Sequence, residues 1–264
     1  MALSGRAPPG AARVTGLAQR RAGRPLARGA VVTLVGAALG FVAVTLAVRN
    51  GWLLPVDEAV LGWVAARRDC GAIAAATALS FIGAGEVSLL LTALLVAGAL
   101  LRRQPHAAAA LLLLYVSLPI ELALKHTLAQ PLPGVLYPIP GACEWYHPAL
   151  SVPTPHSYPS GYAIRVTYFF ALAAAAVLGG QPEALRRGWR TPLLRPLAVL
   201  GLAIVLVLLL ASRLVLSWHW PSDLFGGALL GVALAAATLI AARYGLAPEP
   251  ASVGRPERGH RRRR

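Results

Sequence analysis

The stretch Ser212-Arg213-Leu214-Val215-Leu216-Ser217-Trp218-His219-Trp220-Pro221-Ser222-Asp223 lies between two long apolar segments. Charged side chains are costly at a membrane boundary and usually serve a function there. Pro221 suits the first turn of the following helix, and Asp223 suits the dipole at that helix N-terminus. From four positions along the chain, Asp223 can turn back to hydrogen-bond His219, which leaves the other ring nitrogen free as a nucleophile. Arg213 offers a planar fork for a phosphoryl group.

The composition is that of a membrane protein. Of 264 residues, 57% are hydrophobic and 13% are charged, and the mean hydropathy is +0.63. A soluble globular domain carries about 25% charged residues. A net charge of +15 would suggest nucleic acid as the partner of a soluble protein, but most of this charge lies in tails and short loops. We therefore expect membrane lipids and no nucleic acid as partners, and the oligomeric state stays open.

Six apolar segments predict an all-α fold, a polytopic membrane bundle of about six transmembrane helices. They are Val31–Val48, Val87–Leu101, Ala107–Leu128, Gly161–Leu178, Leu193–Ala211 and Leu224–Ala242. The shorter run Ala72–Ile82 cannot span a bilayer alone, so we expect it to be re-entrant or to pack under the bundle. Residues 50–70 predict an interfacial amphipathic segment.

The chain divides into three predicted regions. Residues 1–29 form a basic tail without acids, punctuated by Pro and Gly, which we expect to be disordered. Residues 30–244 form the transmembrane domain, and residues 245–264 form a second basic tail with predicted disorder. The first apolar segment exceeds the ~7–15 residues of a signal peptide core, and no small-x-small site follows it, so an uncleaved anchor is expected.

Two further polar segments precede Ser212–Asp223. Lys125, the only lysine in the chain, is followed by Leu132-Pro133, and Pro159-Ser160-Gly161-Tyr162 opens the fourth apolar segment. In order and spacing the three segments resemble the motifs Lys-x6-Arg-Pro, Pro-Ser-Gly-His and Ser-Arg-x5-His-x3-Asp of the type 2 phosphatidic acid phosphatase (PAP2) and vanadium haloperoxidase superfamily. The resemblance covers roughly residues 50–243 and implies an integral membrane lipid phosphatase. Leu132 and Tyr162 stand where the family has Arg and His.

The resemblance implies a role for each motif residue. The motif-three histidine, His219 here, attacks phosphorus and forms a phosphohistidine, while Asp223 orients its ring. The phosphate oxygens are held by Lys125, Ser160, Gly161 and Arg213. The family needs no metal, and we expect no cofactor.

Local helix chemistry supports two of these assignments and adds one. Ser160 can cap the helix that begins at Gly161, whose free N–H groups can face an anion. Arg165 lies three residues beyond Tyr162 on the same helical face, and an arginine inside a membrane needs a partner. That partner is either the phosphate or the intramembrane acid Glu121.

The two departures bear on activity. Loss of a preorganised donor at Leu132 commonly costs ~10²–10³ in rate. Tyr162 can act as the catalytic acid, but with a reference pKa of ~10 a tyrosine is a weaker acid than an imidazolium. His156 or His126 could supply the proton instead, the alternative for each being a solvated loop histidine. An impaired relative that binds lipid phosphate headgroups without turnover is the competing function, although intact His219 and Asp223 favour the enzyme.

The leaving group suggests a substrate. A phosphate monoester such as phosphatidic acid expels an alkoxide, which needs an acid. A diphosphate expels a phosphate whose second pKa is near ~6, so it departs with little help. Without the motif-two histidine, a polyprenyl diphosphate such as undecaprenyl diphosphate is the expected preferred substrate.

Charge predicts the topology in the cell membrane. With a cytoplasmic N-terminus, 19 of the 25 basic residues lie on the cytoplasmic side. The positive-inside rule then places both termini inside and residues 129–158 outside. All three motifs share that outer face, so an extracytoplasmic active site is expected. Cys70 and Cys143 also lie there, where a disulfide can persist, and a bridge and two free thiols are both open.

Overall fold

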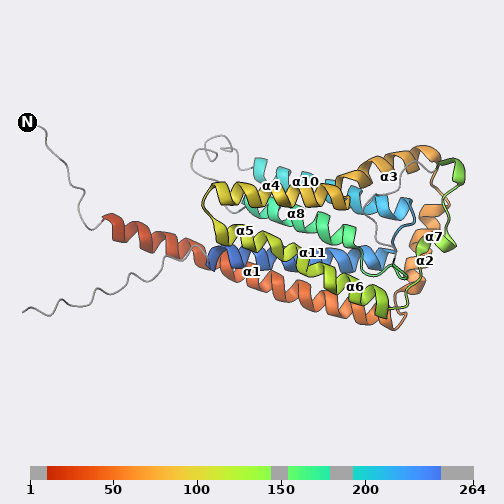
Figure 1. The fold of residues 1–264 in the computed structure, drawn as a ribbon, viewed down its shortest axis with the longest axis horizontal. Helices are drawn as coiled ribbons and strands as arrows, with labels where there is room; N and C mark the ends of the chain where they lie inside the picture. Colours follow the sequence, from red (N-terminus) through yellow and green to blue (C-terminus); the bar gives the residue numbers. More distant parts are fainter. Residues whose placement is uncertain (1–10, 144–153, 179–192, 245–264) are drawn as a thin grey trace, which may run out of the picture.

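The structure, a computed structural model, describes residues 11–143, 154–178 and 193–244 (Figure 1). These residues form helices and contain no strand, which confirms the predicted all-α class. The helices are α1 (Ala11–Arg49), α2 (Leu54–Ala65), α3 (Cys70–Ile82), α4 (Gly85–Leu101), α5 (Pro105–Leu111), α6 (Ser117–Thr127), α7 (Pro133–Leu136), α8 (Gly161–Leu178), α10 (Leu194–Val215) and α11 (Pro221–Tyr244). Short 3-10 helices at Leu112–Val116 and Gly141–Cys143 complete the fold.

Within the described residues, six stretches are long and apolar enough to cross a membrane, as predicted. They are Arg28–Arg49, Cys70–Leu101, Pro105–Thr127, Gly161–Leu178, Leu194–Val215 and Pro221–Ala242. The second stretch differs from the sequence interpretation, because the short run Ala72–Ile82 lies in α3, which α4 follows directly. The helical backbone is interrupted between them at Gly83, where a Cβ would collide with the side chains of Tyr162 and Val166 on α8.

The first helix begins earlier than the sequence indicated. α1 starts at Ala11, so residues 11–29 are helical and not the irregular tail that was predicted. Alanine and arginine make up ten of these 19 residues and have high helix propensity, which favours extension of the helix beyond the apolar span. Residues 1–10, 144–153 and 245–264 lie outside the described residues, so the predictions for the rest of both tails and part of the 129–158 loop stay predictions.

Helix α11 is the central packing element. It packs against α1, α5 and α8, and its residues Leu230 and Leu234 join Ile164 and Tyr168 of α8 in the main buried core. Close approach of α8 and α11 requires small residues. A Cβ on Gly231 would lie 2.5 Å from the Ile164 carbonyl oxygen, and Gly227 meets the α8 start in the same way. Small residues serve this purpose between membrane helices generally.

A second packing layer joins α3, α8 and α10. α10 packs against α3 and α8, and Leu209 of α10 is buried with Tyr162 and Val166. A disulfide joins Cys70, at the start of α3, to Cys143, with a Cα–Cα distance of 5.2 Å. The structure therefore contains the bridge and not the two free thiols.

The motif-bearing ends of the helices lie together (Figure 1). The end of α6 and the starts of α8 and α11 share one end of the bundle with α2 and α7, whereas the start of α1 and the end of α11 lie at the opposite end. Lys125, Ser160 and His219 are thus brought to the same end although the chain separates them widely.

Helix α2 is tied to the start of α11 by a buried carboxylate. Asp57 is 2% exposed and accepts hydrogen bonds from the Ser222 backbone N–H (2.9 Å), the Ser222 hydroxyl (2.5 Å) and the Gln130 amide (3.4 Å). Burial raises the pKa of Asp57, and the charge of Asp223 raises it further. The carboxylate thus satisfies a backbone donor in the first turn of α11.

Arg68 makes a second link at this end of the bundle. Its guanidinium donates to the backbone carbonyls of Val215 (2.9 Å), Tyr137 (3.0 Å) and Pro138 (2.8 Å) and to the Ser217 hydroxyl (2.5 Å). It therefore joins the loop after α2 to the segment that leads to His219.

Replacing Asp57 with Ala should lower the free energy of unfolding by about 1–3 kcal/mol, because buried donors of Ser222 and Gln130 lose their acceptor. Thermal unfolding in detergent measures the change. Glu58→Ala is the matched control, since Glu58 is the exposed neighbouring acid on α2. Equal melting temperatures for the two variants would contradict the anchoring role of Asp57.

Candidate active site

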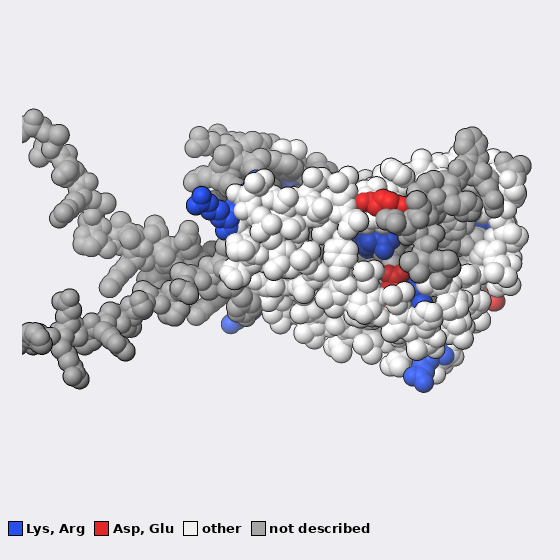
Figure 2. Space-filling model, in the orientation of Figure 1, with Lys and Arg blue, Asp and Glu red and all other residues white. Residues whose placement is uncertain are grey.

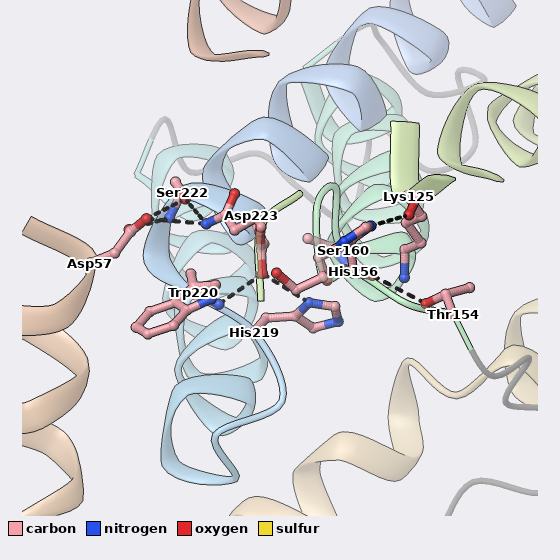
Figure 3. Close-up of polar contacts among 12 residues, drawn as sticks. Asp57, Lys125, Thr154, His156, Ser160, His219, Trp220, Ser222 and Asp223 are labelled. Atoms are coloured by element: carbon pink, nitrogen blue, oxygen red, sulfur yellow. Dashed lines mark hydrogen bonds and ion pairs between the residues drawn. The ribbon is translucent and has the colours of Figure 1, made fainter. Parts of the chain in front are cut away.

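Asp223 holds the ring of His219. Its Oδ2 accepts from His219 Nδ1 at 3.3 Å and from the Trp220 backbone N–H at 2.9 Å (Figure 3). Asp223 is 0% exposed, and its place in the first turn of α11 fixes the carboxylate. Because a carboxylate only accepts, Nδ1 carries the proton and the lone pair lies on Nε2.

The surroundings favour the neutral form of His219. Burial lowers the pKa of His219, and the positive charges of Lys125 and Arg213 act in the same direction. The hydrogen bond and charge of Asp223 oppose this shift without cancelling it. A neutral imidazole retains the lone pair that a nucleophile needs.

Ser160 joins the second motif to the third. Its backbone N–H donates to the Asp223 carbonyl at 3.1 Å, and its hydroxyl accepts from the Ala163 N–H at 3.2 Å. The predicted helix cap is therefore present, and the start of α8 is bound directly to the start of α11. At the next position, a Cβ on Gly161 would displace the Glu121 carboxylate, which glycine allows to approach the start of α8 closely.

Lys125 lies in the last turn of α6 and is 9% exposed. Its amine pairs with Glu121 at 3.3 Å, and the charge of Glu121 also acts on Arg165. Glu121, the alternative to phosphate as the expected partner of Arg165, is thus close to it. Figure 2 shows acidic and basic side chains gathered together on a surface that is otherwise mostly uncharged.

Arg213 lies between two aromatic rings. Its guanidinium carbon is 3.5 Å from the Tyr162 ring centroid and 4.6 Å from that of Trp218, distances typical of cation–π contacts. Arg213 also donates to the Ser80 carbonyl at 3.3 Å. The Tyr162 hydroxyl donates to the Leu79 carbonyl at 3.5 Å. Tyr162 therefore packs on Arg213, and its predicted role as an acid stays a prediction.

The two histidines considered as substitutes differ in their surroundings. His126 is exposed on α6. His156 is partly buried, and its Nδ1 lies 2.9 Å from the Lys125 carbonyl oxygen. Only His156 is therefore held by a hydrogen bond between the first two motifs.

At the other departure, Leu132 is 39% exposed just before α7 and offers no donor. The sequence interpretation assigned no role to Asp57 or Arg68, both of which hold the motif-three segment. The sequence signals for such roles are an acid, Asp57, within the apolar α2 and an arginine, Arg68, directly after that helix.

No group of three or more His, Cys, Asp or Glu side chains within the described residues is arranged to hold a metal ion.

The fold is similar to that in the crystal structure of the first transmembrane PAP2 type phosphatidylglycerolphosphate phosphatase from Bacillus subtilis. The TM-score is 0.58 at 20% sequence identity, and the match covers 76% of this chain and 92% of that chain. At this identity the likeness concerns the fold. No curated protein matches the chain. The family model of the PAP2 superfamily matches residues 87–245, a region that contains all three motifs, and the chain therefore belongs to the PAP2 superfamily.

Proposed function

We propose that the protein is an integral membrane lipid phosphatase that acts through a phosphohistidine at His219. Membership of the PAP2 superfamily indicates a phosphatase-type membrane enzyme. The observation that carries the residue assignment is the 3.3 Å contact between His219 Nδ1 and Asp223 Oδ2, beside the start of α8. This contact directs the Nε2 lone pair away from Asp223.

The reaction has two steps. In the first, the Nε2 lone pair of His219 attacks phosphorus, and the bond from phosphorus to the leaving oxygen breaks. The electron pair goes to that oxygen, which takes up a proton. In the second, water attacks the phosphohistidine, the N–P electron pair returns to Nε2, and inorganic phosphate leaves. Asp223 keeps the proton on Nδ1 and stabilises the positive charge that develops on the ring.

The phosphate is held by cations and a helix start. Lys125 has three donors, so its amine can bind a phosphate oxygen while it contacts Glu121. The Tyr162 and Trp218 rings orient the fork of Arg213. The first turn of α8, which Ser160 and Gly161 begin, adds N–H groups and the positive end of the helix dipole. Arg165 is a further phosphate ligand in this proposal, with Glu121 as its second partner.

The site is proposed to face the outside of the cell membrane, with both termini in the cytoplasm. An even number of spans agrees with the start of α1 and the end of α11 lying toward the same end, opposite the site (Figure 1). With this topology, 19 of the 25 basic residues of the sequence are cytoplasmic. The Cys70–Cys143 bridge at the site's end suits an oxidising compartment.

The proposed substrates are lipid phosphates and lipid diphosphates, with polyprenyl diphosphate and phosphatidic-acid-like lipids as the two classes. They share a phosphoryl group attached to a membrane-embedded chain. The choice between them depends on the group that protonates the leaving oxygen.

Replacing His219 with Ala should abolish phosphate release, because the reaction loses its nucleophile. Asp223→Asn should lower kcat by about 10²–10⁴, since an amide no longer imposes the reactive tautomer. Phosphate release from a panel of lipid phosphates, with purified protein in detergent, measures both effects. His106→Ala is the matched control, because His106 is exposed in α5, far along the chain from the motifs.

If His219→Ala and Asp223→Asn both released phosphate at the wild-type rate, hydrolysis would take place at a different site. Lipid phosphate binding by an inactive wild-type protein would favour the competing function, a headgroup-binding relative without turnover.

The substrate-free protein should show a His219 titration midpoint below the ordinary histidine value of ~6.5, since burial, Lys125 and Arg213 all disfavour the imidazolium. Nitrogen NMR of labelled histidine, with the His219→Ala spectrum for assignment, measures the midpoint. Asp223→Asn should lower it further, because the opposing carboxylate charge is lost. A midpoint at or above ~6.5 would contradict the predicted neutral nucleophile.

A further inference from the structure

At position 162, where the family pattern has its catalytic acid, this protein has a tyrosine that contacts Arg213 and α3. Tyr162 stacks on Arg213 at 3.5 Å, and its hydroxyl donates to the Leu79 carbonyl of α3 at 3.5 Å. Its ring also packs on Gly83, where a Cβ would collide with it. These contacts direct the tyrosine toward α3 and Arg213, and the leaving oxygen needs a different proton donor.

His156 is held on the Lys125 side of the site. Its Nδ1 lies 2.9 Å from the Lys125 carbonyl oxygen. A carbonyl only accepts, so Nδ1 carries a proton in every protonation state of the ring. Proton exchange is therefore confined to Nε2.

The backbone around His156 is held on both sides. The Thr154 hydroxyl donates to the His156 carbonyl at 3.2 Å, and the Ser157 N–H donates to the Gln130 carbonyl at 3.2 Å. The Ser157 hydroxyl donates to the Pro131 carbonyl (3.2 Å), which also accepts from the Trp220 indole (2.7 Å). His156 is thus fixed relative to both Lys125 and the residue that follows His219.

The same arrangement is visible in the close-up. Figure 3 shows the His156 ring joined by a dashed line to the Lys125 backbone carbonyl, in the same close-up as Ser160 and His219. The charge of Lys125 acts on His219, which agrees with their closeness. His156 is also the fourth residue before Ser160, whose N–H is bonded to Asp223.

We infer that His156 is the catalytic acid and base of this protein, the role that histidine at position 162 has in the family pattern. The inference rests on the proposed function, because it assigns a proton donor to the same phosphohistidine reaction. Its carrying observation is the hydrogen bond between His156 Nδ1 and the backbone carbonyl of Lys125, which leaves Nε2 as the ring nitrogen that exchanges a proton.

The proton balance closes over the two steps. As His219 Nε2 bonds to phosphorus, the imidazolium of His156 gives its Nε2 proton to the leaving oxygen and becomes neutral. As water attacks the phosphohistidine, the same Nε2 takes a proton from that water and the imidazolium is restored. The Nδ1–H bond to Lys125 persists throughout.

This assignment broadens the substrate class. With a positioned imidazolium, an alkoxide leaving group receives its proton, so phosphate monoesters of lipids are substrates alongside diphosphates. The diphosphate preference expected from Tyr162 alone is therefore removed.

The test measures the single-turnover rate of leaving-group release, which reports the first step alone, for wild type and His156→Asn on phosphatidic acid, a polyprenyl diphosphate and p-nitrophenyl phosphate. The second step, hydrolysis of the phosphohistidine, is common to all three substrates and is excluded from this rate. Asn keeps a donor for the Lys125 carbonyl but transfers no proton. A positioned acid is worth ~10²–10⁴ in rate, so the first-step rate on phosphatidic acid should fall by at least about 10²-fold. Release of nitrophenolate from the aryl ester, which needs no proton, should slow by less than about tenfold, and the first step on the diphosphate should slow by an intermediate factor.

Three comparisons make the result specific to proton transfer. His106→Asn is the matched histidine control. Tyr162→Phe keeps the ring on Arg213 and removes the competing acid. Inhibition by inorganic phosphate, measured for His156→Asn and His156→Gln, reports whether the phosphate site is intact.

Selective loss on phosphatidic acid in His156→Asn, with unchanged phosphate inhibition, supports the inference. Equal loss on all three substrates, no loss, or weakened phosphate inhibition in both His156 variants overturns it, as does a selective loss in Tyr162→Phe instead. A wild type inactive on all three substrates would overturn the proposed function and this inference with it. If His156→Asn still releases nitrophenolate, His219 is still active as the nucleophile. The proposed function then stands whether or not the role of His156 does.

Discussion

The hydrogen bond from the Ser160 amide to the Asp223 carbonyl, at 3.1 Å, joins the starts of α8 and α11. Through it, the start of α8 is bound directly to the residue that holds the His219 ring. The bond requires close approach of two helices, which Gly227 and Gly231 permit because side chains there would collide with the α8 backbone. In a lipid environment such backbone pairing is favoured, since unsatisfied polar groups are costly.

Around this unit, the polar groups of the site's end hold the connecting segments in place. Asp57 satisfies the first turn of α11, and Arg68 fastens the segment before His219. Both residues precede residues 87–245, the region that the family model matches. Side chains from helix α2 and the loop after it thus hold the segment that carries the third motif.

The departures at positions 132 and 162 have different structural consequences. Leu132 removes a donor, and the nearby Arg68 does not replace it because it is bound to backbone carbonyls and Ser217. Tyr162 adds an aromatic face on which Arg213 rests. In the proposed mechanism, Tyr162 therefore orients Arg213 as a phosphate ligand, and proton transfer is assigned to His156, outside the motif.

The sequence by itself determined the helical class, the six apolar spans and the dyad of His219 and Asp223, because these depend on apolar length and on local spacing around one helix start. Only the tertiary structure joined α3 to α4, bridged Cys70 to Cys143, and distinguished His156 from His126. It also assigned Asp57 and Arg68 their roles. Each of these depends on segments distant in the chain, whose pairing no local pattern encodes. The packing of the bundle leaves His126 exposed on α6 and brings His156 to the Lys125 carbonyl, a pairing of segments 31 residues apart.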